Sequence, residues 1–357
     1  MATALATVQG TASMPRNPHS IVVLGGDTYD TWSNPQIVKE VAVELATNQS
    51  SEGLLRVCDP QFKIVDKYAN ATGYPNLPMQ FSMGFGPNLS PVLFQGKLQS
   101  VEREDTDTIF RAYDLAYQMK FQQKTEYHNN KTDVQIIQTL ATRNGLNFVG
   151  PSTDPGTAPH VSLIQDSKHD WHLAHERAKA ANLVIYCRLN TLYAQEPATY
   201  TSPIITLVYR GWATPPSPMM FHRWNGRYKL PENFAGRHQQ FTRYGRAKGG
   251  KRLTGKSDKN QRGHVGLNMT HELHQNKQAY ANRMAQASKA LNREHAFVFA
   301  IRVPPTWEVG PDNRDTVALT QFGKFFSGDY LLDKVHYEHN AHGIVCELTP
   351  YRDIAQV

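Results

Sequence analysis

A chain of 357 residues can hold two domains and a small insertion, and its 24 glycines and 21 prolines favour short strands joined by turns. Because no run of about 18 apolar residues occurs and residues 1–20 lack a charged stretch followed by an apolar one, we expect neither a membrane-spanning helix nor a secretory signal. The net charge of +7 is concentrated in one segment, and three widely spaced cysteines without metal-ligand spacing predict a reducing cytoplasm.

Alternation of apolar and polar residues predicts strands through most of residues 1–125. A period of two gives each strand one apolar face, which is typical of an antiparallel sheet or barrel around a single core. We interpret this region as a first β-barrel domain. The predicted strands are residues 21–24, which end in a Gly25-Gly26 turn, 40–45, 79–85, 92–102 and 109–113.

Two helix-then-strand units predict a small α/β module inserted at residues 126–200. The first unit begins with a capping box at Thr132, is apolar at helical spacing, and stops at Asn144-Gly145 before a short strand. The second unit begins with a cap within residues 167–170 and ends in a strand at 183–187. The predicted fold class is therefore α+β, mostly β.

The rest of the chain returns to strand and turn patterns around one long predicted helix. Residues 201–236 predict return strands and a bend, and residues 237–266 predict a basic flexible loop. Residues 267–357 predict a second β-barrel domain that includes the helix, placed at 272–293 by its apolar side. Its strands are predicted at residues 297–303, 316–322, 330–337 and 344–348, with a turn at 339–343.

Several sequence signals follow one another in a set order over most of residues 20–350. They are the modules Asp133-Val134 to Gly145-Leu146 and Asp166 to Leu183, the Asp170-Trp171 pair, the long helix, the Val309-Gly310 bend and the ending Gly328-Asp329-Tyr330 to Val335-His336. With these signals the chain resembles the late-control-protein-D family of baseplate hub proteins from contractile-tailed phages. It is also similar to the hub portion of type VI secretion spike proteins.

That resemblance implies two barrels akin to tail-tube subunits, with the α/β module between or beside them. Three copies would form a ring whose six barrels match a sixfold tube. The implied partners are two further copies in a homotrimer, the tail tube protein, the central spike protein and the tape-measure protein, with baseplate wedge proteins as an additional candidate. We therefore expect a structural, non-enzymatic protein of the tail baseplate of a virion, assembled in the host cytoplasm without a cofactor.

A basic segment at residues 237–262 departs from the family pattern. Five Arg and four Lys against the single acid Asp258 give it a net charge of +8, which leaves −1 of the total +7 for the rest of the chain. It either contacts an acidic partner surface, which we favour over DNA in a tube lumen, or is a solvated linker. The candidate partner-binding residues are Arg243, Arg246, Lys248, Lys251, Arg252, Lys256, Lys259 and Arg262.

Gly250 to Ser257 matches the phosphate-loop pattern G-x-x-x-x-G-K-S, which raises nucleotide binding as an alternative function. A phosphate loop lies between a buried strand and a helix. Residues 241–249 are polar and basic instead, and residues 258–263 have no apolar helical face. We favour the hub and keep a P-loop nucleotide-binding protein and a basic nucleic-acid-binding protein as alternatives.

Two histidine triplets repeat a spacing of three residues. On a helix this spacing turns by about 60° at each step, so three ligands converge only partly on one metal ion. We expect the first triplet to lie on a solvated helix face, the second to lie on a strand and its turn, and neither to bind a metal; no nucleophile or acid pair stands out as catalytic. The triplets are His169, His172 and His175, and His336, His339 and His342.

Overall fold

Two compact units make up the chain. Unit 1 holds residues 1–115, 198–227 and 298–352, and unit 2 holds residues 116–197, 228–297 and 353–357. No helix in the described ranges is long and apolar enough to cross a lipid bilayer. The computed structural model describes residues 17–73, 76–85, 88–89, 92–152, 159–196, 202–203, 205–208, 223–228, 242–246, 252–256, 297–303, 314–321 and 326–352, with the backbone alone for the strands between residues 205 and 303.

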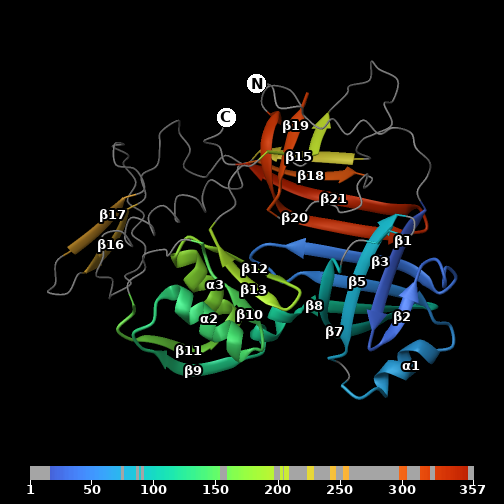
Figure 1. The fold of residues 1–357 in the computed structure, drawn as a ribbon, viewed down its shortest axis with the longest axis horizontal. Coiled ribbons are helices and arrows are strands. Elements are labelled where there is room, and N and C mark those ends of the chain that lie inside the picture. The colour runs from blue at the N-terminus through green and yellow to red at the C-terminus, as the bar shows by residue number, and fades with distance from the viewer. Residues whose placement is uncertain are drawn as a thin grey trace. The chain divides into compact units, whose positions relative to one another are not determined.

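A 14-stranded sheet forms unit 1, in the order β15-β18-β21-β20-β3-β4-β8-β7-β5-β1-β2, with β19 beside β20, β14 beside β19 and β6 beside β5 (Figure 1). The unit also contains the short helix α1 (Lys63–Ala69). The strands are β1 (Pro18–Leu24), β2 (Asp27–Asp30), β3 (Val38–Ala46), β4 (Glu52–Cys58), β5 (Pro78–Phe85), β6 (Asn88–Leu89), β7 (Phe94–Glu104), β8 (Asp107–Asp114), β14 (Ile205–Val208), β15 (Arg223–Tyr228), β18 (Phe297–Val303), β19 (Thr316–Thr320), β20 (Gly328–Asn340) and β21 (Gly343–Arg352).

Strands from both predicted barrel domains belong to this one sheet. β3 of the first predicted domain pairs antiparallel with β20 of the second, with Val43 opposite Tyr337. Among the described strands the path stays open, because no pairing joins β2 back to β15. The mostly β character predicted from the sequence is confirmed, and the described pairings contain no closed barrel.

One face of the sheet forms the core of unit 1. Val43 and Leu45 are buried on β3, as the period of two in residues 40–45 predicted. Phe81 and Phe94 meet edge to face with their ring centroids 5.4 Å apart. A Cβ atom on Gly53 of β4 would lie only 2.6 Å from the Phe81 ring, so glycine lets β4 pass close to this aromatic pair.

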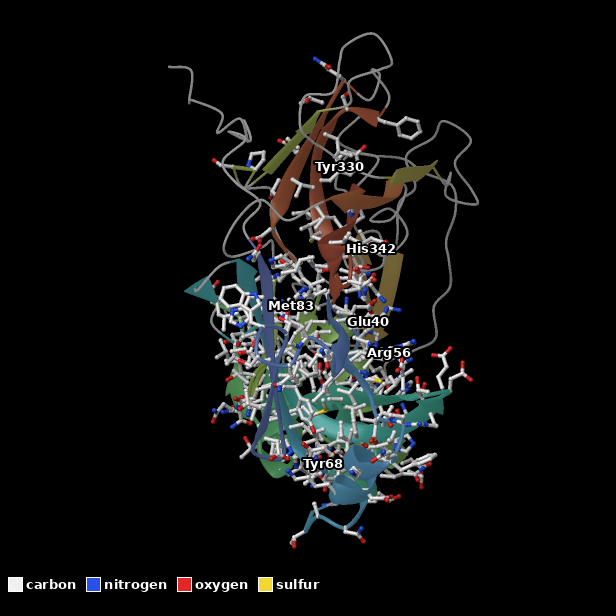
Figure 2. All side chains as sticks on the ribbon, turned by 90° about the vertical axis from the view of Figure 1, so that its right-hand side faces the viewer. Glu40, Arg56, Tyr68, Met83, Tyr330 and His342 are labelled. Carbon is white, nitrogen blue, oxygen red and sulfur yellow. The ribbon has the colours of Figure 1, made fainter. Side chains whose placement is uncertain are left out.

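The other face of the same strands carries paired charges. Arg56 of β4 lies 3.4 Å from Glu40 and 2.7 Å from Glu104 (Figure 2). Arg111 of β8 pairs with Glu52 at 2.7 Å. Each exposed pair stabilises the fold by about 1 kcal/mol or less. The sheet is therefore held mainly by its apolar face, with a solvated charged face opposite.

Most predicted strands of unit 1 are confirmed, and one helix corrects the prediction. The Gly25-Gly26 turn joins β1 to β2 with φ angles of 59° and 99°, which suit glycine. The sequence predicted no helix in residues 1–125, whereas Lys63–Ala69 forms α1. The Asp59 carboxylate accepts hydrogen bonds from the backbone N–H groups of Ile64 and Val65, at 3.1 and 3.0 Å, and so caps this helix from a preceding turn.

Unit 2 contains a three-stranded sheet, β10-β13-β12, with α2 and α3 packed side by side against it (Figure 1). Two separate two-stranded sheets pair β9 with β11 and β16 with β17. Both predicted helix-then-strand units are therefore present. The elements are the 3-10 helix Leu115–Lys120, which begins at the end of unit 1, β9 (Gln123–His128), α2 (Asp133–Arg143), β10 (Asn147–Val149), β11 (Leu163–His169), α3 (Asp170–Ala180), β12 (Val184–Arg188), β13 (Thr191–Gln195), β16 (Thr242–Arg246) and β17 (Arg252–Lys256).

The two helices of unit 2 begin differently. The Thr132 side chain accepts from the Gln135 N–H and the Gln135 side chain accepts from the Thr132 N–H, so the predicted capping box of α2 is confirmed. α3 begins after His169, as the sequence placed it, but without a side-chain cap. The predicted helix at 272–293 and the Val309-Gly310 bend lie outside the described residues.

Candidate interaction surfaces

Half of the predicted partner-binding residues lie on the β16–β17 hairpin of unit 2. Arg246 of β16 is directly opposite Arg252 of β17, and the hairpin also carries Arg243 and Lys256. Four positively charged residues therefore lie on one two-stranded ribbon, and this composition suits an acidic surface or a polyanion. The remaining four residues lie outside the described part of the chain: Lys248, Lys251, Lys259 and Arg262.

The hairpin differs from the loop predicted throughout residues 237–266. The sequence lacks an apolar period there, but a two-stranded ribbon needs only cross-strand backbone hydrogen bonds. The hairpin also contains part of the phosphate-loop motif. Residues 252–256 of that motif form β17, and Lys256 is opposite Thr242. In a strand, successive N–H groups point to alternate edges and cannot converge on one phosphate. The backbone of these residues therefore does not have the strand-loop-helix arrangement of a phosphate loop.

The two histidine triplets lie in unlike surroundings. His172 is exposed on α3, and the pKa of His175 is lowered by burial, with further contributions from Lys179 and His172. In the second triplet, His342 is exposed in the β20–β21 turn while His339 is buried on β20. In the part of the chain that the structure describes, no three metal-ligating side chains gather at one point.

A buried carboxylate ties the helices of unit 2 to the β9–β11 ribbon. Asp170, fully buried at the start of α3, accepts hydrogen bonds from Arg143 of α2, from Asn144 at 2.8 Å and from Gln165 of β11 at 2.9 Å. Burial by itself raises the pKa of Asp170, but the hydrogen bonds from Arg143, Gln165 and Asn144 lower it below its ordinary value. Asp170 is therefore a charged structural anchor, although the sequence presented it as part of a helix cap.

A second buried carboxylate, Asp133, lies in the first turn of α2. Its Oδ1 is 2.7 Å from Nε2 of His160 and 3.6 Å from Nη1 of Arg177 on α3. All three side chains are at least nine-tenths buried. These contacts link α2, α3 and the segment before β11, and the sequence contained no local signal for them because the partners are more than 25 residues apart.

An apolar pair lies exposed on the β9–β11 ribbon. Tyr127 and Ile164 are opposite each other on the two strands, with 64% and 47% of their surfaces exposed. Val161, just before β11, is 61% exposed. Exposed apolar residues that gather in this way mark candidate contact surfaces. The sequence analysis missed this ribbon because its strands alternate weakly and its pairing spans an intervening helix.

A family model described as the Alg8 N-terminal domain matches residues 31–212, just over half of the chain. No curated protein sequence matches the chain.

Solved structures match nearly the full length of the chain. The tail protein from Neisseria meningitidis MC58 has a TM-score of 0.68 at 12% identity, over 94% of this chain and 97% of that chain. The 43 kDa tail protein of prophage MuSo2 from Shewanella oneidensis has a TM-score of 0.63 at 13% identity, over 94% and 98%. An E. coli component of the type VI secretion system, described as similar to T4 bacteriophage tail proteins, has a TM-score of 0.53 at 8% identity, over 88% and 73%. At these identities the likeness shows a shared fold.

Proposed function

The chain belongs to the Alg8 N-terminal domain family, and because its fold is shared with phage tail proteins we propose that it is a structural protein of a contractile phage tail. Its specific role in this proposal is the baseplate hub. A homotrimer of the chain adapts the hexameric tail tube to the central spike. The observation that carries the proposal is the match over 94% of this chain to two tail proteins that are themselves covered almost completely.

The sheet of unit 1 supports a role in assembly. Its hydrogen-bonded path is open among the described strands, and an open sheet edge can pair with a strand of another chain. A threefold ring needs such heterologous contacts, in which one surface of each copy meets a different surface of the next. In the proposal, residues 1–125 and 267–357 supply two tail-tube-like barrels per copy, so that six barrels face the tube.

The proposed partners are the tail tube protein, the central spike protein, the tape-measure protein and baseplate wedge proteins. The likeness to a type VI secretion component supports a place next to a spike. The basic β16–β17 hairpin is proposed to bind an acidic surface of one of these proteins in preference to DNA. The protein then acts by binding and shape, as a non-enzymatic component of the virion baseplate assembled in the host cytoplasm.

The buried acids of unit 2 have a structural role and are not candidate catalytic groups. Asp170 and Asp133 are engaged by Arg143, His160 and Arg177 in contacts that hold helices and strands together. A general acid or base has to reach a substrate, and these carboxylates are fully buried.

The test is the oligomeric state of the purified full-length chain, measured by light scattering with and without its spike partner. We expect a trimer, with a Lys256→Ala variant that forms the same trimer and nucleotides that bind neither protein. Cryo-electron microscopy of the assembled particle then places the chain between tube and spike. A chain that stays monomeric with the spike present, or that is found away from the baseplate, contradicts the proposal.

A binding measurement separates the two interpretations of the hairpin. Charge reversal by Arg246→Glu and Arg252→Glu is expected to abolish binding to an acidic tail partner and leave the trimer intact. DNA binding at physiological salt that the same reversal removes would favour the nucleic-acid alternative instead.

A further inference from the structure

The first strand of unit 1, β1, meets β20 of the C-terminal hairpin at one buried hydrogen bond. Oγ of Ser20 on β1 lies 2.7 Å from Nδ1 of His339 on β20, although 319 residues separate them. Ser20 is fully buried and His339 is 7% exposed. In the described sheet β1 pairs only with β2 and β5, and β20 with β3, β19 and β21. The side chains, and no described backbone ladder, therefore join β1 to β20.

The groups around His339 leave its ring without an acidic partner in the described structure. Its neighbours across the sheet are Val41 of β3 and Ile344 of β21, which are apolar. The titratable side chain that acts on it from β1 is His19. Glu40, next to Val41, is engaged by Arg56 on the outer face of the sheet.

The one nearby carboxylate of β2 is already committed to His19. Oδ1 of Asp30 lies 2.9 Å from Nε2 of His19, and Asp30 also accepts from the Trp32 N–H and the Ser33 hydroxyl. The His19 ring stacks on Trp32 with a centroid distance of 4.1 Å and an interplanar angle of 9°. Asp30 is therefore engaged by His19 and by the turn that follows β2.

Protonation of His339 would place an uncompensated charge inside the junction. A neutral ring can accept from the Ser20 hydroxyl at Nδ1, whereas a protonated ring donates from Nδ1 and requires the hydroxyl to turn and accept. The new charge would also be buried beside His19 without a counter-ion. Burial first, and His19 second, lower the pKa of His339 from 6.5 to about 4.

We propose that the Ser20–His339 contact is an acid-sensitive latch, which holds β1 against the β20–β21 hairpin at neutral pH and releases it when His339 is protonated. Because the pKa of His339 is lower in the closed state than its ordinary value, the closed state has its full stability at pH values above that ordinary pKa. The stabilisation is lost as the pH falls from 6.5 towards about 4, by up to roughly 300-fold in the closing equilibrium constant. The latch acts within one chain and does not depend on the proposed trimer.

Hydrogen exchange measured by mass spectrometry on the full chain tests the latch. From neutral pH to about pH 4.5, after correction for intrinsic exchange rates, peptides covering Pro18–Leu24 should lose protection before the β7–β8 hairpin does. A His339→Gln variant, whose amide can still accept from Ser20 but does not titrate, should keep that protection. The matched control is His342→Gln, an exposed histidine of the same hairpin (Figure 2), which should behave as the unaltered chain.

Two outcomes overturn the latch. One is equal loss of β1 protection in the unaltered chain and the His339→Gln variant, and the other is no selective loss in the unaltered chain. If the variant fails to fold, the imidazole titration of His339 followed by NMR in the unaltered chain decides. A midpoint near about 4 supports the latch, and a midpoint near the ordinary 6.5 contradicts it.

Discussion

Unit 1 and unit 2 use buried charge in different ways. The core face of the large sheet is apolar, and the Arg56 and Arg111 pairs of the same strands lie on its solvated face. Its buried carboxylates, Asp59 and Asp114, accept hydrogen bonds from backbone N–H groups. In unit 2, Asp170 and Asp133 are fully buried and paired with cationic or titratable side chains. Stability in unit 1 is therefore spread over many apolar contacts, whereas unit 2 depends on a few pairs that each need both partners.

Removal of Asp170 should give the largest loss of stability and is the strongest test of the difference between the two units. An Asp170→Ala variant removes the buried carboxylate that Arg143, Asn144 and Gln165 share and leaves Arg143 with Glu126, at 2.9 Å, as its carboxylate partner, which costs about 3 kcal/mol of unfolding free energy. Denaturant unfolding followed by circular dichroism measures it. The double variant Asp170→Ala with Arg143→Met should lose less than Asp170→Ala alone, and a larger loss in the double variant would refute the paired-charge explanation.

Overfilling the apolar core of unit 1 should cost less. A Gly53→Val change brings its Cβ against the Phe81 ring, and strain of this kind costs about 1–3 kcal/mol. The same unfolding measurement applies. Adding Phe81→Leu should recover part of the loss because it removes the ring atoms that clash. If Gly53→Val leaves stability unchanged, the close approach of β4 to the aromatic pair does not limit this core.

The two helix starts of unit 2 offer a matched comparison of local contributions. Thr132→Ala removes the side-chain cap of α2 and should cost about 1 kcal/mol. His169→Ala at the uncapped start of α3 should cost clearly less, because no side-chain hydrogen bond is lost there. Equal losses at the two positions, measured by thermal and denaturant unfolding, would mean that the capping box adds nothing beyond packing.

Removal of a surface charge on unit 1 should have the smallest effect. Glu104 is more than half exposed and pairs with Arg56 at 2.7 Å. Glu104→Ala should change the unfolding free energy by no more than about 0.5 kcal/mol, with even less effect at high salt. Set beside Asp170→Ala, this variant tests whether burial decides the value of a charge pair. A loss as large as that of Asp170→Ala would show that it does not.

The parts that the sequence predicted share one property, which is that their cause lies within a few residues. The Gly25-Gly26 turn and the Thr132 capping box follow from local backbone and hydrogen-bond chemistry. The alternation of Met79, Phe81 and Met83 followed from the pleat of one strand, and all three are buried.

The parts that the sequence did not predict have unusual local geometry or distant partners. α1 is local but begins after Phe62, a residue with positive φ, and its N-terminal N–H groups bond to Asp59 rather than to a residue at the usual cap position. The exposed pair of Tyr127 and Ile164 exists only because β9 and β11 find each other across α2. The basic strands β16 and β17 lack the apolar period that normally marks a strand.

The sequence by itself determined the mostly β class, most hairpins of unit 1 and the two helix-then-strand units, because turn chemistry and side-chain period act over short distances. Only the tertiary structure decided that β3 and β20 share one sheet, that Asp170 meets Arg143, and that Ser20 meets His339. Such pairings are chosen by burial, shape and charge across hundreds of residues, and any one strand or carboxylate is compatible with many partners.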